Sequence, residues 1–171
     1  MSRFHFRCSL LAALLALGAC GFEPLYGRFG DSSIADDLAR IKIQVIGGRS
    51  GQLLRNHLLD GLTPKGELAR PAYTLRVELL EPRPQDLGIA RDDSIVRYSY
   101  SSVVRFMLND PAGRLVLAGQ SSSVSSYEVT NSEFATVSGR TNARDRVLEE
   151  IAIDMKAQLA VFFRSHRNPT S

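Results

Sequence analysis

The sequence predicts an α+β fold, a two-layer sandwich of an about four-stranded, mostly antiparallel sheet with two helices packed on one face. Three observations predict it. Several stretches alternate apolar and polar residues, which indicates strands. Two stretches have apolar residues at spacings of three and four, which indicates helices. Clusters of Gly, Pro, Asn and Asp separate these stretches, and the resulting order is β-α-β-β-β-α.

The composition fits one soluble domain. The chain has 171 residues, of which 44% are apolar and 23% charged, so a polytopic membrane protein and a disordered chain are both excluded. The formal charge is +3, from 21 basic and 18 acidic residues. Leaving out Arg3 and Arg7, which lie in a segment we expect to be removed, leaves 19 against 18. This balance gives no reason to expect nucleic acid as a partner.

The first strand is predicted over residues 40–46 and the first helix over residues 50–62. The strand is expected because its apolar residues alternate with polar ones, and they are Ile41, Ile43 and Val45. The helix is expected because leucines recur at every fourth position, at Leu54, Leu58 and Leu62. Gly47 and Gly48 separate the two elements, and Pro64 stops the helix.

Three further strands are predicted over residues 73–79, 95–108 and 114–129. The middle one alternates most clearly, and its apolar face carries Val96, Tyr98, Tyr100, Val104, Phe106 and Leu108. The segment from Asn109 to Gly113 lies between two apolar runs and predicts the turn of a hairpin. The last strand is weakly apolar in its second half, so we expect it at an edge of the sheet.

The longest helix is predicted over about residues 141–163, after an irregular stretch at 130–139. Its apolar stripe consists of Leu148, Ile151, Ala152, Met155, Leu159, Phe162 and Phe163. Asn142 is a candidate N-cap, with Asp145 in the first turn. Residues 165–171 have nothing to pack against and are expected to form a flexible tail.

The first twenty residues have the pattern of a bacterial lipoprotein signal peptide. Two arginines come first, and a largely apolar run of ten residues follows at 8–17, too short to span a bilayer. The next residues complete Leu17-Gly18-Ala19-Cys20, which resembles the lipobox. The cysteine is essential there because its thiol takes up diacylglycerol. We therefore predict a signal peptide at residues 1–19, a lipidated N-terminus and tether at 20–39 and a folded domain at 40–164.

Lipidation of Cys20 predicts where the mature protein lies. Diacylglycerol and an N-acyl chain would be attached covalently there, and we expect no other cofactor. Each buried methylene contributes about 0.8 kcal/mol, so three acyl chains anchor the protein effectively permanently. Gly21, rather than Asp, follows the cysteine, and by resemblance to the enterobacterial sorting rule this points to the outer membrane.

The sequence contains no catalytic constellation, so we expect a binding protein rather than an enzyme. His57 and His166 are the histidines of the mature chain, and its cysteine would be acylated, so metal and thiol chemistry lack ligands. The glycines form no phosphate-binding loop, and the serines form no G-x-S-x-G elbow.

Binding is expected on the sheet face that the helices leave free. Its predicted basic side chains are Lys42, Arg76, Arg97 and Arg105. They would dock in the wet interior of another protein or bind phosphate groups, which the planar fork of arginine suits. A polar free face is also ordinary in antiparallel sheets, so simple solvation stays open as an alternative for each residue.

Five short segments have counterparts, in the same order, in one known family. They are CGFEPLY at 20–26, GQLLRN at 51–56, SYEV at 126–129, SEFA at 132–135 and ARDR at 143–146. The chain thereby resembles the LPS-assembly lipoproteins (LptE) of alphaproteobacteria over nearly its whole mature length. It departs from enterobacterial members in its shorter tail, so tail contacts are not carried over.

The resemblance implies a lipoprotein at the periplasmic face of the outer membrane that plugs the barrel LptD. Such a protein helps the barrel assemble and delivers lipopolysaccharide to the outer leaflet. LptD, lipopolysaccharide and the outer membrane are therefore the implied partners. Because a barrel lumen is polar and lipid A carries phosphates, the four basic residues would contact one or the other. A periplasmic lipoprotein subunit of a lipid-transporting ABC system remains the alternative.

Overall fold

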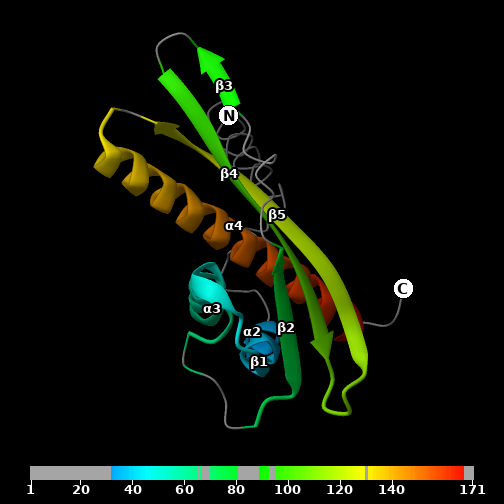
Figure 1. Ribbon diagram of the computed structural model, residues 1–171. Coiled ribbons are helices and arrows are strands. Elements are labelled where there is room, and N and C mark those ends of the chain that lie inside the picture. Colours follow the sequence, from blue (N-terminus) through cyan, green and yellow to red (C-terminus); the bar gives the residue numbers. More distant parts are fainter. Residues whose placement is uncertain are drawn as a thin grey trace, which may run out of the picture. The chain divides into compact units, whose positions relative to one another are not determined.

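Figure 1 shows the computed structural model, which describes residues 32–64, 66, 70–80, 89–92, 95–129 and 131–167. The elements in chain order are α2 (Ser32–Ala39), β1 (Ile41–Ile43), α3 (Gly48–Leu62), β2 (Tyr73–Leu80), β3 (Ile89–Asp92), β4 (Ile95–Asn109), β5 (Leu115–Val129) and α4 (Glu133–Arg167). The chain separates into two compact units at Ser32, and the sheet, α3 and α4 all belong to the second. The predicted signal peptide and Cys20 lie outside the described residues.

β4 is the central strand of the sheet. One of its edges pairs with β5 along almost its whole length, antiparallel. Its other edge pairs antiparallel with β3 at residues 95–98 and with β2 at residues 103–109. β1 pairs with β2 in parallel, and the two are joined through α3. The described strands therefore form a mixed, mostly antiparallel sheet of five, as the α+β class requires.

α3 and α4 lie on the same face of this sheet (Figure 1). The core fills the space between the two layers, and its fully buried side chains include Leu54, Leu58, Leu75, Phe106, Leu108, Leu148, Ile151, Met155 and Leu159. These include the leucines expected on the first helix and most of the stripe expected on the last. Burial of such side chains is the main source of stability in a domain of this size. The predicted arrangement of two helices on one face is confirmed.

The serine-rich half of β5 faces α4 through its odd-numbered residues. Ser123 donates a hydrogen bond to Glu150 Oε2, and Arg146 Nε donates one to Ser125 Oγ at 3.2 Å. Gly119 lies on the same side, under Phe106 and Gln158. Small residues let the helix approach the strand closely, which explains why this half of β5 is weakly apolar.

The first strand is shorter than predicted, because it ends at Ile43. Val45, expected on its apolar face, is 87% exposed, and Ile46 is buried in its place. The alternation breaks there because the chain leaves the sheet to reach Gly47, the N-cap of α3. α3 itself begins at Gly48, two residues before the predicted start.

α4 is longer than predicted at both ends. Ser132 Oγ accepts a hydrogen bond from the Ala135 N–H at 3.3 Å, which is the contact of an N-cap. Asn142, expected to cap this helix, therefore lies inside it. At the other end the helix continues into the expected tail as far as Arg167, and Ser165 Oγ donates to the Phe162 carbonyl at 2.9 Å.

Two elements were not predicted. Residues 20–39 were expected to be a tether, yet 32–39, which the structure describes, form α2, and its Ile34 and Leu38 are buried in the core. β3 pairs with the start of β4 and has no predicted counterpart. The packed domain thus begins before residue 40. No helix in the described ranges has the length and apolar character that crossing a membrane requires.

Candidate functional site

The second face of the sheet carries the candidate site. In the described part of the chain, α3 and α4 both lie on the opposite face (Figure 1). We call this second surface the open sheet face. Its side chains alternate along each strand with the buried ones, and those used below are Lys42, Arg76, Glu78, Leu80, Arg97, Val103, Arg105, Met107, Gln120 and Glu128.

All four predicted basic residues lie on the open sheet face, with exposed side chains. Lys42 comes from β1, Arg76 from β2, and Arg97 and Arg105 from β4. The alternation that predicted their shared face is thus confirmed by the strand register. Their distribution over that face was not evident from the sequence, and it divides them into two groups.

Three of the four form a diagonal across neighbouring strands, which we call the basic band (Lys42, Arg76 and Arg105). Lys42 pairs with Thr74, two residues before Arg76. Arg76 pairs in turn with Met107, two residues after Arg105. Diagonal neighbours in a sheet are about 7–8 Å apart, within reach of long side chains. The band therefore gathers positive charge from three strands.

Acidic and polar side chains flank the basic band. Arg105 lies opposite Glu78 on one side and Gln120 on the other. Arg76 Nε donates a hydrogen bond to Gln44 Oε1 at 3.3 Å, which holds its guanidinium over the β1–β2 junction. This bond uses one of the five N–H donors of the guanidinium.

Arg97 stands apart from the band. It lies eight residues from Arg105 along β4, which corresponds to about 26 Å of extended strand. Its Nη2 is 3.5 Å from Glu128 Oε1 on β5, and the two side chains are 58% and 51% exposed. Such an exposed ion pair contributes about 0–1 kcal/mol. Arg97 and the basic band therefore cannot contact the same phosphate group.

Two shallow hollows adjoin the basic band. One, of about 550 Å³, is lined by Lys42, Ile43, Gln44, Val45, Arg55 and Thr74. The other, of about 330 Å³, is lined by Gln44, Thr74, Arg76, Asn109, Asp110, Pro111 and Gly113. They share Gln44 and Thr74 and so adjoin each other, and we call the two together the recess; basic side chains line both of them. Sequence reasoning missed Arg55, because it lies on a helix and reaches the recess only through tertiary packing.

Asp110 is the acidic residue that lines this recess. Its carboxylate is engaged by hydrogen bonds from its own turn. Its carboxylate accepts hydrogen bonds from the N–H groups of Ala112 and Arg114, each at 2.9 Å, and from Arg114 Nε at 2.7 Å. The Arg114 N–H in particular, with the charge of its side chain, holds the pKa of Asp110 below its ordinary value. Arg114 thus balances the negative charge of Asp110, and the lining cations Lys42, Arg55 and Arg76 leave the recess with a net positive charge.

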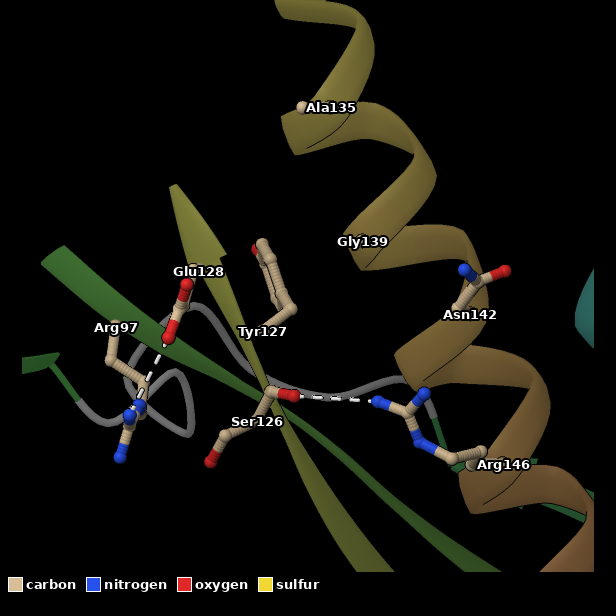
Figure 2. Close-up of a pocket in the computed structure, with 8 residues that line it drawn as sticks. All are labelled: Arg97, Ser126, Tyr127, Glu128, Ala135, Gly139, Asn142 and Arg146. Carbon is tan, nitrogen blue, oxygen red and sulfur yellow. Dashed lines mark hydrogen bonds and ion pairs between the residues drawn. The ribbon is translucent and has the colours of Figure 1, made fainter. Parts of the chain in front are cut away.

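A further pocket surrounds Arg97, at the other end of the hairpin. Figure 2 shows it between the end of β5 and the beginning of α4. Its volume is about 490 Å³, and its lining residues are Arg97, Ser126, Tyr127, Glu128, Ala135, Gly139, Asn142 and Arg146. Arg146 Nη2 donates to the Ser126 carbonyl at 3.4 Å across this pocket. The sequence did not single out Arg146, whose role depends on which strand α4 crosses.

The side chains able to ligate a metal ion are scattered over the described part of the chain. Within the described ranges, no three His, Cys, Asp or Glu side chains gather where they could hold a metal ion. His57 Nε2 lies 3.1 Å from Asp145 Oδ1 and joins α3 to α4. The open sheet face offers a broad polar surface with exposed cations.

No protein-family model matches the sequence, and no curated protein matches it. Solved structures do share its fold. A Caulobacter crescentus protein described as a candidate lipoprotein superimposes with a TM-score of 0.68 at 24% identity, covering 78% of this chain and 96% of that one. A minor lipoprotein from Acinetobacter baumannii does so with a TM-score of 0.53 at 17% identity, covering 71% and 91%. The chain is thus similar in fold to two bacterial proteins described as lipoproteins.

Proposed function

We propose that this chain is a lipid-anchored protein of the outer membrane that docks with the LPS-assembly barrel LptD and assists its assembly and the delivery of lipopolysaccharide. The observation that carries the proposal is the open sheet face, which presents three cations in one band beside a recess. The role is one of binding, not of catalysis.

The N-terminal sequence supports the lipid anchor. Leu17 to Cys20 has the form of a lipobox, after a basic and apolar segment of the right length for export. The two solved proteins with the same fold are themselves described as lipoproteins. Cys20 would therefore carry the acyl chains and hold the domain at the periplasmic face of the membrane.

The character of the open sheet face supports docking against a polar wall. Half-buried Leu80, Val103 and Met107 lie among charged and amide side chains on this face. Non-obligate interfaces have such mixed surfaces, with an apolar middle and a polar rim. The lumen of a membrane barrel is polar as well, so the face suits it.

The basic band supports a role in handling lipopolysaccharide. Lipid A carries phosphate groups, and charge-assisted hydrogen bonds from arginine or lysine are the strong contacts that bind them. Lys42 and Arg76 border the recess, whose carboxylate is engaged by its own turn. One phosphate-bearing headgroup could therefore be held beside the band while the rest of the face contacts the barrel.

Copurification from detergent-solubilised membranes tests the proposal. A tagged chain should bring down a barrel of the size of LptD from the outer-membrane fraction. Recovery of an inner-membrane ABC transporter in its place would overturn the proposal and support the lipid-transport alternative.

Charge reversal in the basic band separates the two contacts. The triple variant Lys42→Glu, Arg76→Glu and Arg105→Glu should lose the barrel, or lose lipopolysaccharide binding in a salt-dependent way, while keeping its fold. A matched variant reverses three exposed cations of α4, Arg140, Lys156 and Arg164, and should keep both. If the band variant keeps both the barrel and lipopolysaccharide binding, these three residues have no binding role and are simply solvated. Arg97→Glu, tested separately, shows whether the distant pocket takes part.

A further inference from the structure

The pocket around Arg97 contains a second cation, Arg146, which forms no ion pair within the described part of the chain. Arg146 Nε donates to Ser125 Oγ at 3.2 Å, and its Nη2 donates to the Ser126 carbonyl at 3.4 Å. Both partners are neutral, and they use two of the five N–H donors of the guanidinium. Arg97, in contrast, is already paired with Glu128. Arg146 therefore has both the charge and the donors to bind an anionic group.

One wall of this pocket is the outer edge of β5, which no strand in the described ranges pairs. The Ser126 carbonyl accepts its bond from Arg146, so it points outward, toward α4 (Figure 2). The Gln120 carbonyl does the same, because it accepts a bond from Gln158 of α4. Alternate residues of a strand present both backbone groups to the same edge. The register is unbroken over this half of β5, so the N–H and C=O groups of Ser126 and Glu128 all point outward.

The opposite wall is one side of α4. Four residues at spacings of three and four line the pocket from this side, and they are Ala135, Gly139, Asn142 and Arg146. The first two have the smallest side chains, which leaves room beside the first turns of the helix. A Cβ on Gly139 would lie 3.7 Å from the Glu128 carbonyl oxygen, so the missing side chain leaves that carbonyl accessible.

Tyr127 lies between the two walls (Figure 2). Its half-buried ring stacks on Tyr98, with the ring centroids 6.0 Å apart and the planes at 23°. Because the neighbouring tyrosine supports the ring, Tyr127 gives the pocket a fixed apolar surface. The volume of about 490 Å³ falls within the range of small-ligand sites.

These features together fit the end of a peptide. A free carboxylate or phosphate would use Arg146 alone, and an apolar molecule would use the tyrosine alone. An extended peptide uses the cation for its terminal carboxylate and pairs with the N–H and C=O groups of the strand edge, which is the mode called β-strand addition. With its carboxylate at Arg146 and its chain leaving past Glu128, the peptide would run antiparallel to β5.

We propose that this pocket binds the C-terminal residues of a partner polypeptide as an added strand, antiparallel to β5, with the terminal carboxylate on Arg146. The last residue of the partner would pair with Ser126, and the third from the end with Glu128. The side chain of the residue between them would lie beside Tyr127. The inference goes beyond the proposed function and does not depend on it, because the pocket includes no residue of the basic band.

Amide chemical shifts of the full chain in detergent test the carboxylate site. The probe is a pool of acetylated tetrapeptides of random sequence with free carboxyl ends, and its control is the same pool with amidated ends. The free pool should shift the Ser126 and Glu128 amides at a concentration at least about tenfold lower than the amidated pool. Equal effects of the two pools, or no shift with the free one, would overturn the proposal. Equal shifts with acetate alone would also overturn it, because a free anion would then be sufficient.

Arg146→Gln separates the charge from the fold. Glutamine keeps an N–H donor for the Ser126 carbonyl but has no charge, so the advantage of the free pool over the amidated pool should disappear. Unchanged amide shifts in the rest of the domain check that the variant folds. Arg164→Gln removes an exposed cation eighteen residues further along α4, about 27 Å away, and should keep that advantage. An advantage that survives Arg146→Gln would contradict the assigned carboxylate site.

N-methylated peptides test the strand pairing with the wild-type chain. A methyl group on the nitrogen of the third residue from the end removes the N–H that would bond to the Glu128 carbonyl, so it should weaken binding at least about tenfold. The same group on the second residue from the end replaces an N–H that points away from β5, and should be tolerated. Equal effects of the two methyl groups would contradict strand addition.

Discussion

At Gly119, the absence of a side chain makes room for the ring of Phe106 from β4 and for the side-chain amide of Gln158 from α4. A Cβ there would lie 2.3 Å from Phe106 Cζ and 2.7 Å from Gln158 Oε1. Gly139, within α4, is different, because its nearest neighbour would be Tyr127 Cβ at 3.6 Å, an ordinary contact. The same residue type thus serves packing at one position and contributes nothing to it at the other.

Substitution by alanine should separate these two glycines. Gly119→Ala should lower the free energy of unfolding by about 1–3 kcal/mol, the usual cost of overpacking. Gly139→Ala should raise it by up to about 1 kcal/mol, because alanine favours the helix. Denaturant titration of both variants measures the difference. Equal effects at the two positions would show that Phe106 and Gln158 do not pack tightly against Gly119.

The Asp110 turn predicts a pH dependence. Because the folded state lowers the pKa of Asp110, its contribution to stability is complete above the ordinary value of 3.8 and is lost as the pH falls through the lowered pKa. Asp110→Asn should therefore melt at a lower temperature than the wild type at neutral pH. The gap should close in strong acid. A gap that is constant over the whole pH range would rule out the carboxylate as its source.

The anchor prediction concerns one atom, the Cys20 thiol. Cys20→Ala should leave the protein with an uncleaved signal or release it in soluble form, since no other residue of the lipobox can accept diacylglycerol. Mass spectrometry of the mature protein measures this directly. An N-terminus at another residue, without acyl chains, would end the lipoprotein interpretation.

At the scale of elements, periodicity predicted which face each long helix or strand buries, because that pattern lies within one element. The stripe of α4 and the alternation of β4 are long, and both were identified on the correct faces. Elements that depend on contacts with other elements were harder to predict from the sequence. β3 has four residues and exists because β4 extends past β2, and α2 is held by two buried residues, Ile34 and Leu38. Neither is long enough for its pattern to stand out from a loop.

The helical stripe can be tested at a position that periodicity alone identified. Leu159 is fully buried, so Leu159→Ala should cost about 2–5 kcal/mol of unfolding free energy. Val161→Ala, two residues away and 64% exposed, should change it by less than about 0.5 kcal/mol. A melting temperature that Leu159→Ala leaves unchanged would show that the helix faces the sheet through another side.

At the scale of the molecule, α3 and α4 cover one face of the sheet, and the other is the open sheet face. Strand alternation was enough to predict that Lys42, Arg76, Arg97 and Arg105 share that face. It could not show that three of them gather in a band while Arg97 lies about 26 Å away, since that depends on strand order and register. It also missed Arg55, which reaches the recess from α3, and Arg146, which reaches the pocket around Arg97 from α4.

Site-specific photo-crosslinking in living cells tests the central claim, that the open sheet face docks with the barrel. A photoreactive phenylalanine analogue at Glu78, in the middle of that face, should form an adduct with a protein of the size of LptD. The same analogue at Glu149, exposed on the opposite side of the domain on α4, should not. An adduct from Glu149 alone, or an adduct from Glu78 with an inner-membrane transporter, would contradict the account.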